Sequence, residues 1–331
     1  MRFFVTGVNG QLGHDVVNEI IKRGYEAVAS DITETYSGLS DGTEVTKAPY
    51  VQLDITDSEK VEKVILDLKA DKVIHCAAWT AVDKAEDEEN FEKVKAINVK
   101  GTESIAKACK KADLVMTYLS TDYVFNGKGE TPWEPDDKNY APINVYGKTK
   151  LDGELLVSSI LEKYFIVRIA WVFGINGNNF IKTMLSVGKN HDELRVVNDQ
   201  IGTPTYTLDL ARLLVDMNET EKFGYYHATN EGGFISWYDF ACEIFKRATK
   251  LNIFDYSKLK VNPVSTEEYG LSKAKRPFNS RLSKEKLTLN GFERLPDWKD
   301  ALERYLKALK EEGLAKSKTI NKREEKWDRL K

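Results

Sequence analysis

The middle of this chain contains a hydroxyl, a phenol and an ammonium group whose order and spacing suit proton transfer. Thr121 ends an apolar run, and Tyr146 and Lys150 follow it four residues apart. Residues four apart on a helix share one face, so the phenol and the ammonium group would lie side by side. A positive charge beside a phenol lowers its pKa and suits it to acid–base work. We predict that these three residues move a proton while a hydride moves.

The tyrosine–lysine spacing alone carries little information. It occurs at Tyr146, Tyr256 and Tyr269. Only Tyr146 follows a strand that ends in serine and threonine, whereas the other two lie in an irregular, lysine-rich stretch. A packing role is the alternative for Tyr146, and its context favours catalysis.

The opening of the chain has the pattern of a dinucleotide-binding turn. Gly7, Gly10 and Gly13 follow the apolar run 1–5. The first glycine permits a tight turn, the second lets a pyrophosphate approach the backbone, and the third lets the next helix pack closely. The N-terminus of that helix would attract phosphates. A glycine-rich turn without a ligand is the alternative, and the strand–turn–helix context disfavours it.

Asp31 is a carboxylate at a position suited to binding the adenosine ribose of a dinucleotide. Asp31 ends the second predicted strand, 18 residues after Gly13. A carboxylate there accepts hydrogen bonds from ribose hydroxyls and repels a 2′-phosphate. We expect NADH to be used at least as well as NADPH, and the two motifs together predict nicotinamide-dependent carbonyl chemistry.

The elements that position these residues alternate between strand and helix, which predicts a parallel sheet. Strands are expected at 2–6, 26–30, 50–53, 72–76, 113–120 and 164–170, and helices near 11–23, 57–68, 88–111, 144–162, 178–190, 207–217, 236–249 and 297–312. Segments 33–49 and 199–205 have the composition of loops.

The predicted fold class is α/β, with a Rossmann-type doubly wound parallel sheet and a smaller C-terminal substrate-binding lobe. The NAD(P)-binding domain would cover 1–174, with later segments able to complete its sheet. The lobe would cover 175–312, and 313–331 would form a charged tail, either a solvated helix or a frayed end.

Composition excludes several classes of function. The 331 residues carry a net charge of -3, which gives no basic excess for nucleic acid or an anionic membrane. We find no apolar run long enough to span a bilayer and no signal-like segment, so a cytoplasmic protein is expected. The three cysteines and four histidines show no metal-ligand or disulfide spacing. The expected partner is a small molecule, and the chain would be a monomer or a homodimer.

Several segments match the pattern of a known family. They are 7–13, 80–86, 120–125, 146–150, 171–173, 177–180, 199–205 and 276–282. Through them the chain resembles the extended short-chain dehydrogenases/reductases and, within these, the dTDP-4-dehydrorhamnose reductase family. The resemblance extends to about residue 310. Segments 80–86 and 276–282 are its more specific parts.

The resemblance implies an NAD(P)H-dependent reduction of the 4-keto group of dTDP-4-dehydro-L-rhamnose. Tyr146 would protonate the keto oxygen while NADH or NADPH delivers hydride to C4. Thr121 would hydrogen-bond the same oxygen, and Lys150 would reach the nicotinamide ribose. These three form the implied catalytic set.

The resemblance also implies two sets of binding residues. The cofactor would contact Gly7, Asn9, Gly10, Gln11, Leu12, Gly13, Asp31, Asp54, Ile55, Ala77, Ala78, Asn98, Tyr146 and Lys150. The substrate would contact Val82, Asp83, Thr121, Asp122, Tyr123 and Trp171 around the sugar, and Asn179, Thr203, Arg276 and Asn279 at the nucleotide end. Segment 276–280 would close over the cleft opposite Tyr146. A core role for Trp171 and a surface role for Arg276 are the alternatives.

Neighbouring chemistries fit less well. Dehydratases of this superfamily carry an acid where this chain has Tyr123, and the pocket has no Cys–His pair for epimerisation. Two alternatives stay open: a cofactor-binding regulatory subunit resembling that of methionine adenosyltransferase, and a reductase of another nucleotide-linked 4-keto sugar. Mg²⁺ also stays open, because Asp15 stands where some members of the family have a metal-bridging glutamate.

Overall fold

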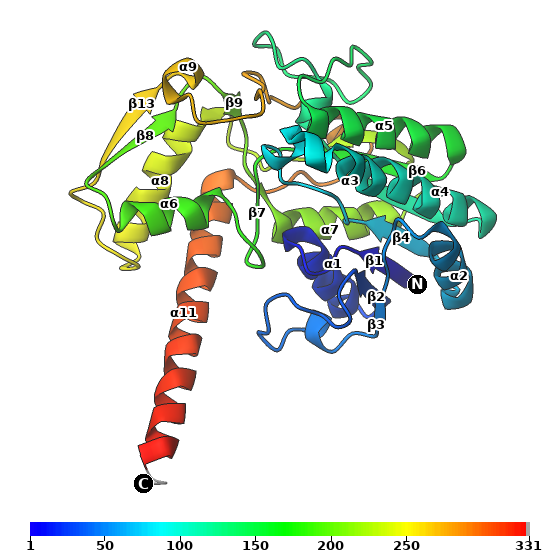
Figure 1. Ribbon diagram of the computed structural model, residues 1–331, viewed down its shortest axis with the longest axis horizontal. Coiled ribbons are helices and arrows are strands. Elements are labelled where there is room, and N and C mark those ends of the chain that lie inside the picture. Colours follow the sequence, from blue (N-terminus) through cyan, green and yellow to red (C-terminus); the bar gives the residue numbers. More distant parts are fainter. Residues whose placement is uncertain (329–331) are drawn as a thin grey trace.

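The structure, a computed structural model, describes the backbone of residues 1–328 and the side chains of residues 1–313. Its most extended element is helix α11 (Trp298–Asp328), which projects from the body of the molecule in Figure 1. This helix runs well beyond the predicted end at 312. The last part of the predicted tail, 329–331, lies outside the described residues.

A seven-stranded sheet forms the centre of the molecule, in the order β11-β6-β5-β4-β1-β2-β3. All its pairings are parallel. The strands are β1 (Arg2–Thr6), β2 (Glu26–Asp31), β3 (Tyr50–Gln52), β4 (Lys72–His75), β5 (Val115–Thr121), β6 (Tyr164–Ile169) and β11 (Gly224–His227). The Rossmann-type sheet is confirmed, and β11, from the second half of the chain, completes it.

Helices cover both faces of the sheet, and each face has its own hydrophobic cluster. One face carries α1 (Gln11–Lys22) and α7 (Thr207–Asn218), and the other carries α2 (Ser58–Leu68), α4 (Thr102–Lys111) and α5 (Val145–Ile160). Phe3 and Val5 of β1 enter the first cluster and Phe4 enters the second, because successive strand residues point to opposite faces. This double cover explains why every residue of β5 is buried.

The predicted helix 88–111 is interrupted. The chain forms turn η3 (Glu88–Asn90), helix α3 (Phe91–Lys95), the π-helix η4 (Ala96–Gly101) and then α4. The π-helix lies where the Asn98 side chain accepts a hydrogen bond from the Trp79 backbone N–H at 2.8 Å. Such interruptions are frequent at functional sites. The helix predicted near 88–111 is therefore present, but it consists of four successive helical elements with a π-helix in the middle.

A smaller lobe stands beside the sheet, around α6 (Phe180–Gly188), α8 (Trp237–Lys250) and the first turns of α11 (Figure 1). Its other elements are β7 (Val172–Phe173), β8 (Glu193–Val197), β9 (Ile201–Gly202), β10 (Thr205–Tyr206), β12 (Ile235–Ser236), β13 (Lys260–Val264) and α9 (Thr266–Tyr269). The predicted loops 33–49 and 199–205 each contain a short element, η1 (Glu44–Thr46) in the first and β9 in the second. Among the described residues, no helix is long and apolar enough to cross a membrane.

Candidate active site

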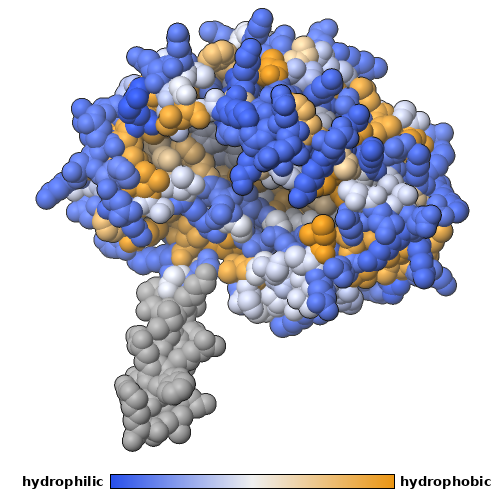
Figure 2. Space-filling model, in the orientation of Figure 1, coloured by the Kyte–Doolittle hydropathy of each residue, from blue (hydrophilic) through white to orange (hydrophobic). Residues whose placement is uncertain are grey.

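A cavity of about 730 Å³ lies at the carboxyl ends of the central strands, where ligands of such sheets bind. Figure 2 shows a hollow in one face of the molecule, with hydrophobic residues inside it and hydrophilic residues around it. Most predicted site residues line the cavity: Gly7, Gly10, Gln11, Leu12, Gly13, Asp31, Asp54, Ile55, Ala77, Ala78, Val82, Thr121, Asp122, Tyr123, Tyr146, Lys150 and Trp171. The structure therefore brings the glycine turn and the tyrosine–lysine pair to one space.

The glycine turn forms a close-packed cradle along the cavity. Gly7 has a φ of +74°, and a Cβ there would lie 2.5 Å from the backbone nitrogen of Ala77. A Cβ on Gly13 would lie 2.4 Å from the Gly7 carbonyl oxygen. Helix α1 begins after Gly10, which has no side chain to cap it, so in the described part of the chain its N-terminal N–H groups have no side-chain cap. This turn fits the diphosphate of a dinucleotide.

Asp31 lies at the rim of the cradle, with its carboxylate held by the backbone. Its Oδ2 accepts from the Asn9 N–H at 2.9 Å, and its Oδ1 accepts from the Ile32 N–H at 2.8 Å. Each oxygen keeps a further lone pair for a ribose hydroxyl. Asn9 itself does not line the cavity, because its side chain bonds to Thr33 and Ser37 of the following loop.

Thr121 and Tyr146 meet where β5 ends and α5 begins. Asn144 caps α5 by accepting the Gly147 N–H at 2.7 Å. A Cβ on Gly147 would lie 2.3 Å from the Tyr123 carbonyl oxygen, so glycine lets α5 approach the turn η5 (Asp122–Val124). The Tyr123 and Tyr146 rings then pack edge to face, 5.6 Å apart. The capping asparagine and the glycine thus place the phenol beside the end of β5.

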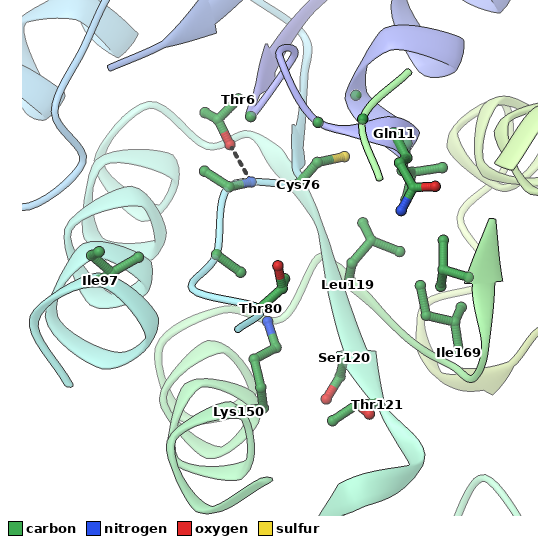
Figure 3. Close-up of a pocket in the computed structure, with 18 of the residues that line it drawn as sticks. Thr6, Gln11, Cys76, Thr80, Ile97, Leu119, Ser120, Thr121, Lys150 and Ile169 are labelled. Atoms are coloured by element: carbon green, nitrogen blue, oxygen red, sulfur yellow. Dashed lines mark hydrogen bonds between the residues drawn. The ribbon is translucent and has the colours of Figure 1, made fainter. Parts of the chain in front are cut away.

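Lys150 occupies a buried position on the same helix. Its ammonium group lies over the Tyr118 ring, 4.1 Å from the ring centroid. Figure 3 shows Lys150 on α5 and Ser120 and Thr121 at the end of β5, around one cavity. Burial lowers the pKa of Lys150 to about 7, although the Glu154 carboxylate favours its charged form.

The electrostatics of Tyr146 differ from the sequence prediction. Burial raises the pKa of Tyr146, and Asp122 and Tyr123 raise it further. The Thr121 hydroxyl acts in the opposite direction. The predicted lowering of this pKa by Lys150 was wrong, because burial and a neighbouring carboxyl outweigh the shared helix face.

Asn98 lies beneath the cavity rather than in its wall. Its Oδ1 accepts from the Trp79 N–H, and its Nδ2 donates to the Thr149 hydroxyl at 3.1 Å. It thereby joins the loop after β4 to α5, one residue before Lys150. The structure gives Asn98 a supporting position instead of the predicted direct contact with the cofactor.

Arg276 and Asp83, both predicted substrate residues, bond to each other. Arg276 Nη2 donates to Asp83 Oδ2 at 2.6 Å, and Nη1 donates to the Tyr123 hydroxyl at 3.2 Å. Because Tyr123 packs on Tyr146, Arg276 is linked to the phenol through one intervening side chain, and closure of segment 276–280 over the cleft stays a prediction. Neither Arg276 nor Asp83 lines the cavity. Arg276 instead contacts the cavity residue Tyr123 through its hydroxyl, and Asp83 holds Arg276 in place.

Three residues predicted to contact the nucleotide end of the substrate form hydrogen bonds to other residues of the protein. Asn179 caps α6 and donates to Gln11 and Tyr305. Thr203 donates to the Gly233 carbonyl, and Asn279 donates to the Thr131 carbonyl. None of the three lines the cavity, and their contacts with the nucleotide stay a prediction. Their polar atoms instead form hydrogen bonds within the protein, to backbone groups and, for Asn179, also to two side chains.

The lining residues that sequence reasoning did not predict include Ser30, Ser120 and Trp237. The Ser30 and Ser120 hydroxyls are buried without a hydrogen-bond partner among the described residues. Both serines stand in sequence beside a predicted site residue, which was an available signal. Trp237 stacks on Trp171 with the ring centroids 3.7 Å apart. No local pattern marks residue 237, because this contact joins segments distant in the sequence.

The described residues contain no group of three or more His, Cys, Asp or Glu side chains that could hold a metal ion. Asp15, the residue at the position linked to Mg²⁺ in the family, is buried and accepts a hydrogen bond from Thr207 at 2.5 Å. Burial raises its pKa to about 7. Such a carboxyl is poorly placed to bridge a metal at the surface.

Comparison with known proteins gives one consistent result. Residues 1–311 match the family model described as the RmlD substrate binding domain. The dTDP-4-dehydrorhamnose reductase of Shigella flexneri is 37% identical over 315 residues, which is 93% of this chain and 98% of that protein.

Two solved structures are similar over nearly the whole chain. A dTDP-4-dehydrorhamnose reductase of Clostridium acetobutylicum has a TM-score of 0.82 and 39% identity, covering 94% of this chain and 100% of that one. The enzyme of the same name from Bacillus anthracis, in complex with NADP, has a TM-score of 0.78 and 38% identity, covering 92% and 98%.

Proposed function

We propose a function for this chain from one premise: it belongs to the family described as the RmlD substrate binding domain. The chain is an NAD(P)H-dependent oxidoreductase that reduces the 4-keto group of dTDP-4-dehydro-L-rhamnose to give dTDP-L-rhamnose. Its relatives at 37–39% identity are named dTDP-4-dehydrorhamnose reductase, the enzyme that catalyses this reaction. The observation that carries the proposal is the single cavity shared by the glycine turn, Thr121, Tyr146 and Lys150.

The cofactor would lie along the first part of this cavity. The turn at Gly7–Gly13 would hold its diphosphate, and Asp31 would accept from its adenosine ribose. The similar B. anthracis structure is a complex with NADP, which supports a nicotinamide dinucleotide as the cofactor. When bound, NAD(P)H supplies the hydride that reaches C4 of the sugar.

The chain's own residues supply the proton and hold the carbonyl. Tyr146 donates its phenolic proton to the keto oxygen as that oxygen gains negative charge. Thr121 offers a second hydroxyl at the same place. A phenol with its ordinary pKa carries its proton at neutral pH, as a reduction requires, and burial raises the pKa of Tyr146 further. The buried Lys150 would reach the ribose beside the phenol.

Turnover by the purified chain tests this function. We expect NADH or NADPH to be consumed on addition of dTDP-4-dehydro-L-rhamnose, with dTDP-L-rhamnose as the product. Other nucleotide-linked 4-keto sugars should react more slowly. Tight cofactor binding without turnover would instead support the regulatory-subunit alternative. We also propose that the protein is cytoplasmic. The chain would be a monomer or a homodimer, and size-exclusion chromatography would distinguish these two states.

A further inference from the structure

Two serine hydroxyls that line the active-site cavity are buried without a hydrogen-bond partner. Ser30 is 1% exposed and Ser120 is 3% exposed, and the Oγ atom of each has no partner among the described residues. The Thr6 hydroxyl lines the same cavity but bonds to His75 Nδ1 at 2.8 Å. A buried hydroxyl without a partner costs free energy. Partners for the two serines therefore come from whatever fills the cavity, either a ligand or water.

Ser120 lies at the end of the cavity where Lys150 is. Leu119 belongs to the hydrophobic cluster on one face of the sheet and Tyr118 to the cluster on the other, so alternation along β5 turns Ser120 to the Tyr118 face. The Lys150 ammonium group lies over the Tyr118 ring on that face. Figure 3 shows Ser120 on β5 and Lys150 on α5 beside one cavity. The Ser120 hydroxyl thus lies in the part of the cavity proposed for the nicotinamide and its ribose.

Ser30 lies at the opposite end of the cavity, one residue before Asp31. Alternation along β2 turns Ser30 to the face of Val28, whose hydrophobic cluster also contains Leu53 and Ile55. Leu53 and Ile55 line the cavity together with Ser30. Asp31, at the adjoining rim, is the residue proposed to bind the adenosine ribose. The Ser30 hydroxyl thus lies in the part of the cavity proposed for adenosine.

The order of the strands places these two hydroxyls on either side of the glycine turn. Strand β1, which leads into the turn, has β2 beside it on one side and β4 and then β5 on the other. From β2 to β5 there are three strand spacings, or about 14 Å. A nicotinamide dinucleotide has the same order, because its diphosphate lies between adenosine and nicotinamide riboside.

We propose that Ser120 and Ser30 are two further cofactor-binding residues, with the Ser120 hydroxyl bonded to the nicotinamide riboside half of NAD(P)H and the Ser30 hydroxyl bonded to its adenosine half. This inference rests on the proposed function, because it takes the same cofactor. Ribose hydroxyls, ring nitrogens and the carboxamide are all groups that a serine hydroxyl can bond, since it both donates and accepts. Cofactor binding then satisfies two buried hydroxyls that the protein itself does not pair.

Binding of the whole cofactor and of its adenosine half to alanine variants tests this proposal without turnover. The probes are NADH, or NADPH if it binds more tightly, followed by fluorescence, and adenosine diphosphate, followed by calorimetry. Ser120→Ala should weaken dinucleotide binding about fivefold, the size of one lost hydrogen bond, and leave adenosine diphosphate binding unchanged. Ser30→Ala should weaken the binding of both probes by about the same factor. The two variants thus distinguish the two halves of the site.

A matched control removes a serine hydroxyl outside the cavity. Ser159 is exposed on α5 and donates to the Leu156 carbonyl, so Ser159→Ala should leave both affinities unchanged. Ser120→Cys and Ser30→Cys, which keep a side chain of similar size with a weaker donor, repeat the test if alanine disturbs folding.

The outcomes separate this inference from the proposed function. Unchanged dinucleotide affinity in a folded variant overturns the role of that serine, and water is then its partner. A Ser120→Ala protein that loses adenosine diphosphate affinity in the same proportion overturns the placement of Ser120. The expected losses in a protein that does not reduce the keto sugar support both serines and count against the proposed function alone. A chain that binds none of the probes overturns both proposals.

Discussion

Arg276 and Asp83 form an ion pair at 2.6 Å across 193 positions of sequence. Asp83 Oδ1 also accepts the Ala274 N–H at 3.0 Å, so the pair holds the segment before Arg276 as well. Through the Tyr123 hydroxyl, the same guanidinium group reaches the wall of the active site. The pair thus joins the segment at Ala274 and Arg276 to the loop after β4.

Arg276→Ala should raise KM for the sugar nucleotide by about tenfold and lower kcat by less. The Tyr123 wall loses its support, which weakens binding in the ground state and transition state alike. Arg276→Lys should rescue little, because one ammonium group cannot span Asp83 and Tyr123 as a guanidinium does. Lys273→Ala, which removes a neighbouring ion pair with the exposed Asp87, is the matched control. An unchanged KM in Arg276→Ala would show that this arginine has no role in substrate binding and is only a surface charge.

Tyr146→Phe should lower kcat by roughly 10² or more while cofactor binding survives. The ring remains and only the phenolic proton is lost, so the effect is that of a missing general acid. Tyr269→Phe removes a phenol with the same lysine spacing outside the cavity, and it should leave kcat unchanged. Steady-state rates and cofactor fluorescence give the two quantities. Near-normal kcat in Tyr146→Phe would remove this residue from the mechanism.

Asp31 should make NADH at least as good a cofactor as NADPH. Its carboxylate is fixed at the rim of the cavity by the N–H groups of Asn9 and Ile32, where it repels a 2′-phosphate. Asp31→Asn should increase the relative use of NADPH, since the repulsion is removed. The kcat/KM ratio for the two cofactors measures this. A ratio that favours NADPH more than tenfold in the unchanged protein contradicts the prediction.

Lys150 should make stability depend on pH. Its pKa falls from 10.5 to about 7 on burial, so the unfolded chain binds more protons between these values. The contribution of Lys150 to the free energy of unfolding should therefore rise as pH increases from about 7 to 10. Lys150→Met should flatten that rise. Urea unfolding of the cofactor-free protein at several pH values tests this, and equal slopes in both proteins would disprove it.

Removal of divalent metal should leave the reduction rate within about twofold. Asp15 is buried against Thr207, and the described residues offer no cluster of three metal ligands. Rates are compared before and after dialysis against a chelator, with Mg²⁺ or Ca²⁺ added back. A loss of rate that Mg²⁺ alone restores would show that the protein uses this ion.

The sequence by itself determined the local features of this protein, such as turns, helix faces and strands, because these depend on residues close together in the chain. The glycine turn could be predicted because backbone conformation and helix packing at Gly7 and Gly13 require glycine. The shared helix face of Tyr146 and Lys150 could be predicted because the two residues are four apart in the sequence. All six strands predicted in the first half lie within two residues of the observed ends, since buried parallel strands are continuous apolar runs.

Only the tertiary structure decided the contacts between distant segments. Trp237 stacks on Trp171, Asn98 accepts a hydrogen bond from the Trp79 N–H, and Arg276 pairs with Asp83. The state of Tyr146 was decided in the same way. Sequence spacing placed a lysine beside it, but burial and the Asp122 carboxyl set the direction of its pKa. Charge interactions depend on distance and solvent exposure in three dimensions, and residue spacing along a helix fixes neither.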